Sequence, residues 1–383
     1  MRKETISIMK KIAHLSTAHI RYDTRILVKE CAVLSQKGFE VYLLVADGLE
    51  VEEQHGVFIK SINKPSGRLK RMTFGVNELF DRAIELDADL YHLHDPELLR
   101  IALKLKKANK KVIYDAHEDI EAQVLSKYWI PKAVRSLVGR EIKKYTESIV
   151  SKLDGLVTAT PGIHNTFARK AKNSATVCNY PILKEFDIST TSKIIRPVLP
   201  EGQYIAYVGG ITETRGMRQL VAAMESFKGE LKLCLAGKIK PFSYKEELTA
   251  IDGWQNVDYL GFLDRDQVSS LLVGAVAGVV TLHPTKAYVD SLPVKMFEYM
   301  AAGIPVIASN FPLWQQIIEE ADCGLCVNPF SVTEITEAVR FLIENPARAK
   351  EMGINGKHVA FERYNWDNEA EKLVSLYNNT LSN

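Results

Sequence analysis

The chain has 383 residues, of which 46% are hydrophobic and 25% charged, and its formal net charge is +2. This is the composition of an ordinary soluble globular protein, and the length suits two domains better than a single core. No run approaches the roughly 18 apolar residues of a spanning helix, and Met1–Lys11 lacks the apolar segment of a secretory signal, so we expect a cytoplasmic protein.

Residues 1–195 predict one α/β domain. Short apolar runs alternate there with amphipathic stretches, and such nearly continuous runs are typical of strands covered on both faces of a parallel sheet. Helical periodicity separates several of them, first at Asp23–Lys37 and again at Pro96–Asn109. The predicted strands are Ile12–Ser16, Glu40–Ala46, Val57–Ile62, Leu90–His94, Val112–Asp115, Gly155–Thr160 and Thr176–Asn179.

Residues 196–365 predict a second α/β domain. Pro181–Pro200, with its prolines and its Ser/Thr cluster, is the predicted linker between the two. Strands alternating with helices indicate doubly wound parallel sheets. The predicted strands are Tyr204–Gly209, Leu231–Ala236, Val257–Leu260, Gly278–Leu282, Pro305–Ser309 and Gly324–Val327. The predicted helices include Arg215–Phe227, Asp266–Val273, Val294–Ala302 and Ser331–Glu344, and a last helix covers Asn368–Ser382.

The strongest local signal is a pair of acids, Asp290 and Glu298, separated by seven residues. Asp290 is predicted to lie in the loop after a strand, and Pro293 marks the first turn of the helix that carries Glu298. A helix N-terminus offers free amide donors to an anion, and paired carboxylates suit sugar and ribose hydroxyls. The structural alternative is an acidic first turn that complements the helix dipole.

A second signal runs from Gly209-Gly210 to Arg215-Gly216. Glycine after a strand lets backbone amides approach phosphate closely, and Arg215 would supply a forked cation. The three-glycine dinucleotide fingerprint is absent because the spacing is wrong. A tight strand-to-helix turn explains the same residues without a ligand.

Two polar clusters, His92–Glu97 and Asp115–Asp119, follow predicted parallel strands. That edge is where open α/β sheets bind ligands. Histidines and acids there suit sugar or acceptor contacts, polar turns without a ligand, or zinc. Because spacing alone does not show that ligands converge, the expectation is that no metal binds.

These motifs resemble family-4 retaining glycosyltransferases of the GT-B fold, over essentially the whole chain. The acid–seven–acid pattern, followed by Met-Ala-Ala-Gly-Ile-Pro-Val-Ile-Ala-Ser, carries the likeness, together with the two polar clusters. The resemblance implies two Rossmann-like domains, 1–195 for the acceptor and 196–365 for the donor, facing across a cleft. It also implies that a helix in 366–383 crosses back onto the first domain.

Site residues follow from the resemblance. Glu298 is expected to bind the donor ribose, Asp290 the donor sugar, Arg215 the diphosphate and His117 the transferred sugar, and these four form the predicted catalytic set. The implied acceptor side comprises Asp23, Arg25, His94, Glu97 and Glu118. The implied donor-binding residues are Gly209, Gly210, Arg215, Gly237, Lys238, Leu260, Phe262, Ser291, Leu292, Lys295 and Glu298.

Two positions depart from the family pattern. Gly210 stands where the family often has arginine, so Lys295 is expected to supply the second phosphate cation. Asp290 replaces the commoner glutamate, which leaves the donor sugar open. The expected reaction is metal-independent transfer from a nucleotide-diphosphate sugar to a carbohydrate or lipid-linked acceptor, with retention. The leaving diphosphate is expected to take the acceptor proton and Arg215 to stabilise its charge.

Three other classes of protein are alternatives. A sugar-nucleotide 2-epimerase of the same architecture would need no acceptor, a two-lobed binding protein is usually exported, and a dehydrogenase lacks its glycine fingerprint. Five scattered cysteines fit a reducing compartment. Cys323 and Cys326 have no second pair at zinc-site spacing, so they predict a buried turn and strand.

Charge is divided unevenly along the chain. Residues 1–195 hold 32 Lys and Arg against 24 Asp and Glu, whereas residues 196–383 hold 17 against 23. Basic clusters near apolar residues would suit an anionic membrane surface, and a solvated helix face explains them equally well. A nucleic-acid partner is not expected, since no aromatic basic platform accompanies the charge. The clusters are Arg68, Lys70 and Arg71; Lys104, Lys106, Lys107, Lys110 and Lys111; and Lys132, Arg135, Arg140, Lys143 and Lys144 beside Trp129, Leu137 and Val138.

Overall fold

A computed structural model describes residues 9–118, 124, 131–187 and 201–382. The chain divides into two compact units, one formed by residues 1–179 with 367–383 and the other by residues 180–366. The tail therefore packs with the first unit. The boundary lies earlier than the predicted 195/196 junction, which falls outside the described residues.

The first unit contains one sheet of eight strands in the order β3-β4-β2-β1-β5-β6-β7-β8. All neighbours pair in parallel except β3 with β4. Strand order reverses between β1 and β5, so their carboxyl ends flank a topological switch point. The strands are β1 Lys11–Leu15, β2 Glu40–Val45, β3 Glu52–Gln54, β4 Val57–Ser61, β5 Leu90–Leu93, β6 Lys111–Ala116, β7 Gly155–Thr158 and β8 Ser174–Thr176.

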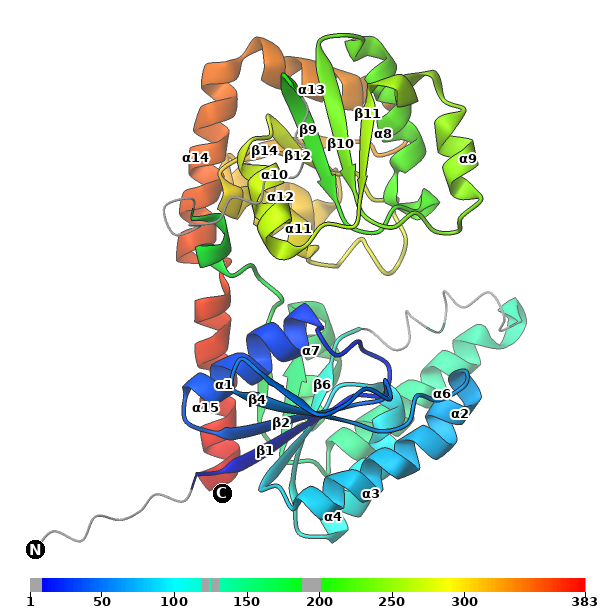
Figure 1. Cartoon of the computed structure of the whole chain (residues 1–383), viewed down its shortest axis with the longest axis vertical. Helices are drawn as coiled ribbons and strands as arrows, with labels where there is room; N and C mark the ends of the chain where they lie inside the picture. Colours follow the sequence, from blue (N-terminus) through cyan, green and yellow to red (C-terminus); the bar gives the residue numbers. More distant parts are fainter. Residues whose placement is uncertain (1–8, 119–123, 125–130, 188–200, 383) are drawn as a thin grey trace, which may run out of the picture. The chain divides into compact units, whose positions relative to one another are not determined.

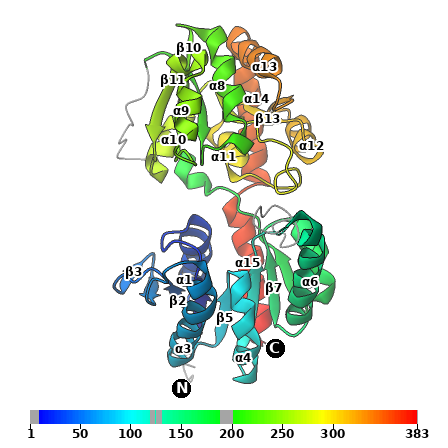
Figure 2. The same cartoon turned by 90° about the vertical axis from the view of Figure 1, so that its right-hand side faces the viewer.

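Helices cover both faces of this sheet (Figures 1 and 2). Alternate residues such as Leu15 and Tyr91 pack in one core with α3, α4 and α6. The residues between them, including His14 and His92, face η1 and α15. The helices are η1 Thr24–Cys31 (a π-helix), α1 Ala32–Gln36, α2 Arg68–Lys70, η2 Arg71–Gly75 (also π), α3 Val76–Leu86, η3 Pro96–Leu98, α4 Leu99–Lys107, α6 Lys132–Val150, α7 Pro161–Phe167, η4 Ala168–Lys170 and α15 Trp366–Ser382.

The second unit is a six-stranded parallel sheet in the order β11-β10-β9-β12-β13-β14. Its switch point lies between β9 and β12. One face packs on α8 and α13. On the other face, a Cβ at Gly278 would lie 2.2 Å from the Tyr299 ring, so glycine in β12 lets α11 approach closely. The strands are β9 Gln203–Val208, β10 Leu231–Ala236, β11 Val257–Gly261, β12 Ala277–Val280, β13 Val306–Ser309 and β14 Gly324–Val327.

Helices of the second unit join these strands in α/β alternation. Its helix α11 also packs against α14. The helices are η5 Leu183–Phe186, η6 Glu213–Arg215, α8 Met217–Ala223, η7 Met224–Phe227, α9 Tyr244–Thr249, η8 Asp252–Asn256, α10 Arg265–Val273, α11 Val294–Ala302, α12 Pro312–Ala321, α13 Val332–Glu344 and α14 Pro346–Glu362.

The secondary structure differs from the prediction in two places that matter for the site. The helix predicted from Arg215 begins instead at Met217, because Gly216 has φ +72° and its Cα lies against the Thr281 carbonyl. The strand predicted at Thr176–Asn179 ends at Thr176, because the Val177 carbonyl accepts from Arg25 and the Cys178 amide donates to Glu369.

Candidate active site

A cavity of about 430 Å³ lies in the second unit, at the carboxyl ends of β9 and β10 beside its switch point. Open α/β sheets place ligands at this position. Six of the predicted donor-binding residues line it: Gly209, Gly210, Arg215, Gly237, Lys238 and Phe262. Phe262 is 73% exposed, and Lys238 Nζ lies 5.3 Å from the centre of its ring, which leaves an aromatic face at the cavity wall.

Two cations converge on Gly209 in this cavity wall. A Cβ at Gly209 would lie 2.8 Å from Lys295 Nζ and 3.3 Å from Arg215 Nη1. Arg215 donates to the Gly210 carbonyl at 3.3 Å, whereas Lys295 Nζ is buried and has no hydrogen-bond partner among the described residues. Burial first, and Arg215 second, hold the pKa of Lys295 well below its usual value. Arg215 and Lys295 are therefore positioned to bind an anion.

Glycines shape the backbone around these cations. Gly209 has φ +128° and Gly237 φ +145°, in the region that favours glycine. A Cβ at Gly237 would lie 1.8 Å from the Gly209 carbonyl oxygen. The turns after β9 and β10 are therefore in direct contact, which is a structural need for glycine in addition to any approach of phosphate.

Glu298 lies buried in α11 and is not free. Its Oε1 accepts a 2.7 Å hydrogen bond from Arg265 Nη1, and Arg265 also pairs with Glu185. Sequence reasoning missed Arg265. The sequence signal that could have located it is the capping box of Asp264 and Gln267, which places Arg265 in the first turn of α10.

The remaining predicted donor residues do not all have the surroundings that their predicted ligand contacts require. Asp290 is exposed, and Ser291 and Leu292 are half-buried. The Ser291 amide, predicted to face a diphosphate, instead donates to the Tyr288 carbonyl at 3.0 Å. The Ser291 carbonyl accepts from the Trp314 indole at 2.6 Å. Leu260, predicted to contact the base, is half-buried in β11 and does not line the cavity.

In the first unit, His117 lies at the carboxyl end of β6 and keeps a partly exposed ring. Its Nε2 is 2.9 Å from an oxygen of the fully buried Asp115 and 3.2 Å from His94 Nδ1. Burial alone would raise the pKa of Asp115, but Arg25 and His117 hold it well below its usual value. His94 is buried, and burial lowers its pKa to about 4. A charged carboxylate thus supports an imidazole that reaches solvent.

The predicted acceptor residues have different surroundings. Arg25 is buried and ion-paired with Asp115 at 3.1 Å and with Glu30 at 3.0 Å, which makes it a core group. Asp23 caps η1 by accepting from two of its amides. Glu97 pairs with Arg71 at 2.8 Å, and Glu118 is exposed.

A second histidine–aspartate pair was missed in the sequence. His19 Nδ1 lies 3.0 Å from Asp95 Oδ1, and the His19 and His117 rings are 5.0 Å apart. Asp95 also accepts from the Thr17 amide at 2.6 Å. Burial alone would raise the pKa of Asp95, yet His19 and these donors lower it to about 2. The two pairs flank the switch point of the first sheet.

Comparison with known proteins shows which family the second half of the chain resembles. The model of the family "Glycosyl transferases group 1" matches residues 191–359. Among curated relatives, the α-maltose-1-phosphate synthase of Mycolicibacterium smegmatis is 25% identical over 45% of this chain and 47% of its own length. The D-rhamnosyltransferase WbpZ of Pseudomonas aeruginosa is 24% identical over 72% of this chain and 70% of its own. The chain matches about half the length of the first such relatives.

Solved structures agree on the fold. The sucrose-phosphate synthase of Thermosynechococcus elongatus superposes with a TM-score of 0.76 at 20% identity, covering 97% of this chain and 99% of that one. HepE of Anabaena, in complex with UDP and glucose, gives 0.73 at 15% identity, covering 96% and 99%. Residues 191–359 are similar to group 1 glycosyl transferases, and the two units have the GT-B fold that the resemblance implied. Membership of family 4 in particular stays a prediction.

Proposed function

We propose that the chain transfers a sugar from a nucleotide-diphosphate donor to an acceptor hydroxyl with retention, without a metal in the reaction. The observation that carries the proposal is the pair of cations at Gly209. Lys295 Nζ is buried without a hydrogen-bond partner among the described residues, 2.8 Å from where a Cβ at Gly209 would lie, with Arg215 beside it. A diphosphate would satisfy both cations.

The chemistry follows from those charges. Arg215 and Lys295 would hold the diphosphate in the ground state and stabilise the charge that grows on the leaving oxygen, an effect worth several kcal/mol in known enzymes. The leaving phosphate would take the acceptor proton, so that no side-chain base is needed. Phe262 would stack on the nucleotide base, and Asp290 would bind donor-sugar hydroxyls.

Glu298 has the role of a ribose ligand that is held ready by Arg265. The 2.7 Å ion pair fixes one carboxylate oxygen, so the other oxygen is the one offered to a ribose hydroxyl. On the acceptor side, we assign His117 as the group that meets the transferred sugar, because its ring is partly exposed and braced by Asp115. Arg25 and His94 support this position from the core and do not touch the acceptor.

The substrates belong to polysaccharide or glycolipid synthesis in this proposal. Support comes from the names of two relatives, WbpZ and the lipopolysaccharide glucosyltransferase WaaG of Escherichia coli, which is 28% identical over 38% of this chain. UDP-sugars are the first donors to try, since HepE was solved with UDP and with UDP-glucose.

The test is a thermal-shift screen of nucleotide-diphosphate sugars, because a ligand of the folded state raises the melting temperature. The stabilising donor is then incubated with and without acceptor sugars, and the anomeric configuration of the product is read by NMR. A retained configuration supports the proposal. Conversion of the donor without any acceptor would instead indicate the 2-epimerase alternative.

A peripheral membrane contact of the first unit is a separate proposal. Leu69 and Phe74 are 77% and 72% exposed beside Lys70 in α2 and η2. Among the described residues, no helix is long and apolar enough to cross a bilayer. Part of the basic charge is already paired, since Lys106 binds Asp154. Co-sedimentation with anionic vesicles at low salt decides the question, and Phe74→Ser should weaken binding if the patch is right.

A further inference from the structure

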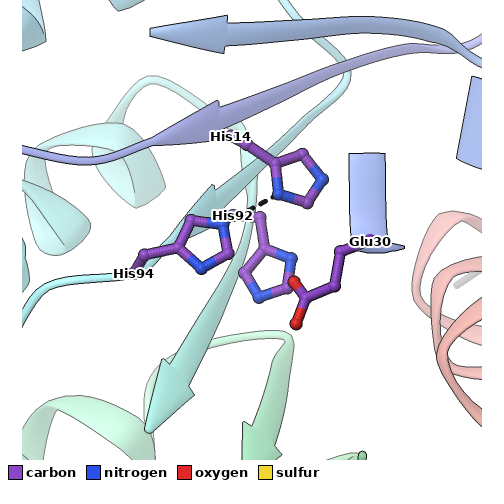
Figure 3. Close-up of side chains that lie close together, drawn as sticks. All are labelled: His14, Glu30, His92 and His94. Carbon is purple, nitrogen blue, oxygen red and sulfur yellow. Dashed lines mark hydrogen bonds between the residues drawn. The ribbon is translucent and has the colours of Figure 1, made fainter. Parts of the chain in front are cut away.

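Three histidines and a glutamate meet in the interior of the first unit. Figure 3 shows the side chains of His14, Glu30, His92 and His94 turned toward one another. Each offers a ligand atom, these atoms all lie within 4.8 Å of one another, and no residue of the four is more than 1% exposed. His14 and His92 are register partners in β1 and β5, while Glu30 comes from η1.

The cluster contains buried polar atoms without hydrogen-bond partners among the described residues. Both carboxylate oxygens of Glu30, and Nε2 of His92, are buried without a hydrogen-bond partner among the described residues. Arg25 is ion-paired with Glu30 and also with Asp115. Two buried carboxyl groups therefore share the guanidinium of Arg25. Buried polar atoms without partners are costly, so the unpartnered ligand atoms of the cluster suit a bound cation.

The outer nitrogens of the rings are already oriented by hydrogen bonds. The Tyr377 hydroxyl of α15 lies 2.5 Å from His92 Nδ1 and 3.1 Å from His14 Nε2. His94 Nδ1 lies 3.6 Å from Asp115 Oδ2. Such partners fix the tautomer and direction of metal-binding histidines. They leave His92 Nε2, His14 Nδ1 and His94 Nε2 for the interior of the cluster.

One pair of ligand atoms already has nearly the spacing that a metal ion imposes. His14 Nδ1 and His94 Nε2 are 2.8 Å apart, whereas two nitrogens on a tetrahedral zinc, each at about 2.0–2.1 Å, are about 3.3 Å apart. For this pair, a shift of a few tenths of an ångström would replace the hydrogen bond between the rings by two metal bonds. The ligand atoms of all four residues lie within 4.8 Å of one another, so the other two would close in on the ion as it binds. Imidazole and carboxylate ligands favour zinc and its neighbours over magnesium or calcium.

We infer that His14, Glu30, His92 and His94 form a buried structural site for one divalent transition-metal ion, with zinc as its natural occupant. The ion ties β1, β5 and η1 together and neutralises the Glu30 carboxylate. This departs from the sequence-based expectation that no metal binds. It does not depend on the proposed glycosyl transfer, in which the ion has no part.

The test begins with the metal content of the full-length chain, purified through a tag without histidine and measured by plasma mass spectrometry. We expect about one equivalent of zinc per chain. After exchange with cobalt, histidine and carboxylate ligands should give visible d–d bands without a thiolate charge-transfer band. This readout needs no variant, and it excludes the Cys323–Cys326 pair as the binding site.

Variants then locate the ion. Glu30→Gln and His92→Gln should lower the zinc content at least about fivefold and remove the rise in melting temperature that added zinc gives to the stripped protein. Cys326→Ser and His358→Ala are the matched controls and should keep one equivalent. Wild-type protein that stays metal-free in micromolar zinc would overturn the inference and leave a proton on Glu30 as the neutralising charge. Thiolate bands in the cobalt form, or full zinc in both cluster variants, would overturn it equally.

Discussion

The variant Lys295→Met separates two effects of this buried lysine, one on the stability of the fold and one on the binding of a nucleotide diphosphate. In the described chain Lys295 Nζ has no hydrogen-bond partner and lies 3.8 Å from the centre of the Tyr207 ring. Burial and the neighbouring Arg215 hold its pKa well below the usual lysine value. Without ligand this charge destabilises the fold. Methionine removes the charge at similar length, so the free energy of unfolding at pH 7 should stay the same or rise by about 1–2 kcal/mol.

With a nucleotide diphosphate the effect has the opposite sign. A hydrogen bond to a charged group contributes about 1.5–3 kcal/mol, so the variant should lose about 10- to 150-fold in affinity for the nucleotide and in kcat/KM. The pH dependence gives a further check. Since the folded pKa of Lys295 is lowered, wild type should gain stability relative to the variant as pH rises from that lowered value toward the usual one.

The assay combines denaturant unfolding at several pH values with calorimetric titration of UDP, and with other nucleoside diphosphates if UDP does not bind. Lys228→Met, at an exposed position, is the matched control and should change neither quantity. A variant that loses stability and keeps its nucleotide affinity would refute the reasoning, because Lys295 would then be a structural group.

Three further predictions concern other parts of the chain. Glu298→Gln weakens the ion pair with Arg265 and should lower kcat/KM for the donor at least about tenfold, so unchanged steady-state kinetics would contradict the ribose role. The pKa of Asp95 is about 2 in the folded protein and about 3.9 in the unfolded chain. Its contribution to stability is therefore complete above about pH 3.9 and is lost as the pH falls through about 2. Asp95→Asn should therefore cost about 2–3 kcal/mol at pH 7 and flatten the acid unfolding curve, whereas an unaltered curve would argue against it. Gly237→Ala would place a Cβ 1.8 Å from a carbonyl oxygen and should lower the free energy of unfolding by more than about 2 kcal/mol, as measured by thermal unfolding. The control Gly229→Ala, where a Cβ would meet open space, should lower it by less. Equal costs would contradict the steric argument.

The sequence was a good guide to the strands of both sheets because their apolar runs are long and nearly continuous. It missed β3, since Glu52–Gln54 is short, polar and at the sheet edge. It also assigned Gly209, Arg215 and Lys295 to one predicted donor site. The structure places the three residues side by side, because the end of a parallel strand and the start of a following helix meet at one edge of the sheet.

The hydrogen-bond and ion-pair partners of the site residues could not be predicted from the spacing of residues along the sequence. Arg265 reaches Glu298 from another helix, and Arg25 turns into the core to pair with Asp115, far along the chain. The Ser291 amide is used in a local turn. Each outcome depends on tertiary contacts between residues distant in sequence, which no local pattern encodes.

The return of the tail to the first unit affects the order in which the protein is completed during synthesis. Helix α15 buries Leu373 and Tyr377 fully, and its Glu369 accepts from the Cys178 amide. Domains usually fold in the order in which they leave the ribosome. Here the unit that emerges first closes last, after the whole second unit has been made. A chain that stops short of α15 would leave uncovered the sheet face that carries His14 and His92, and chaperones and proteases act on such incompletely folded molecules.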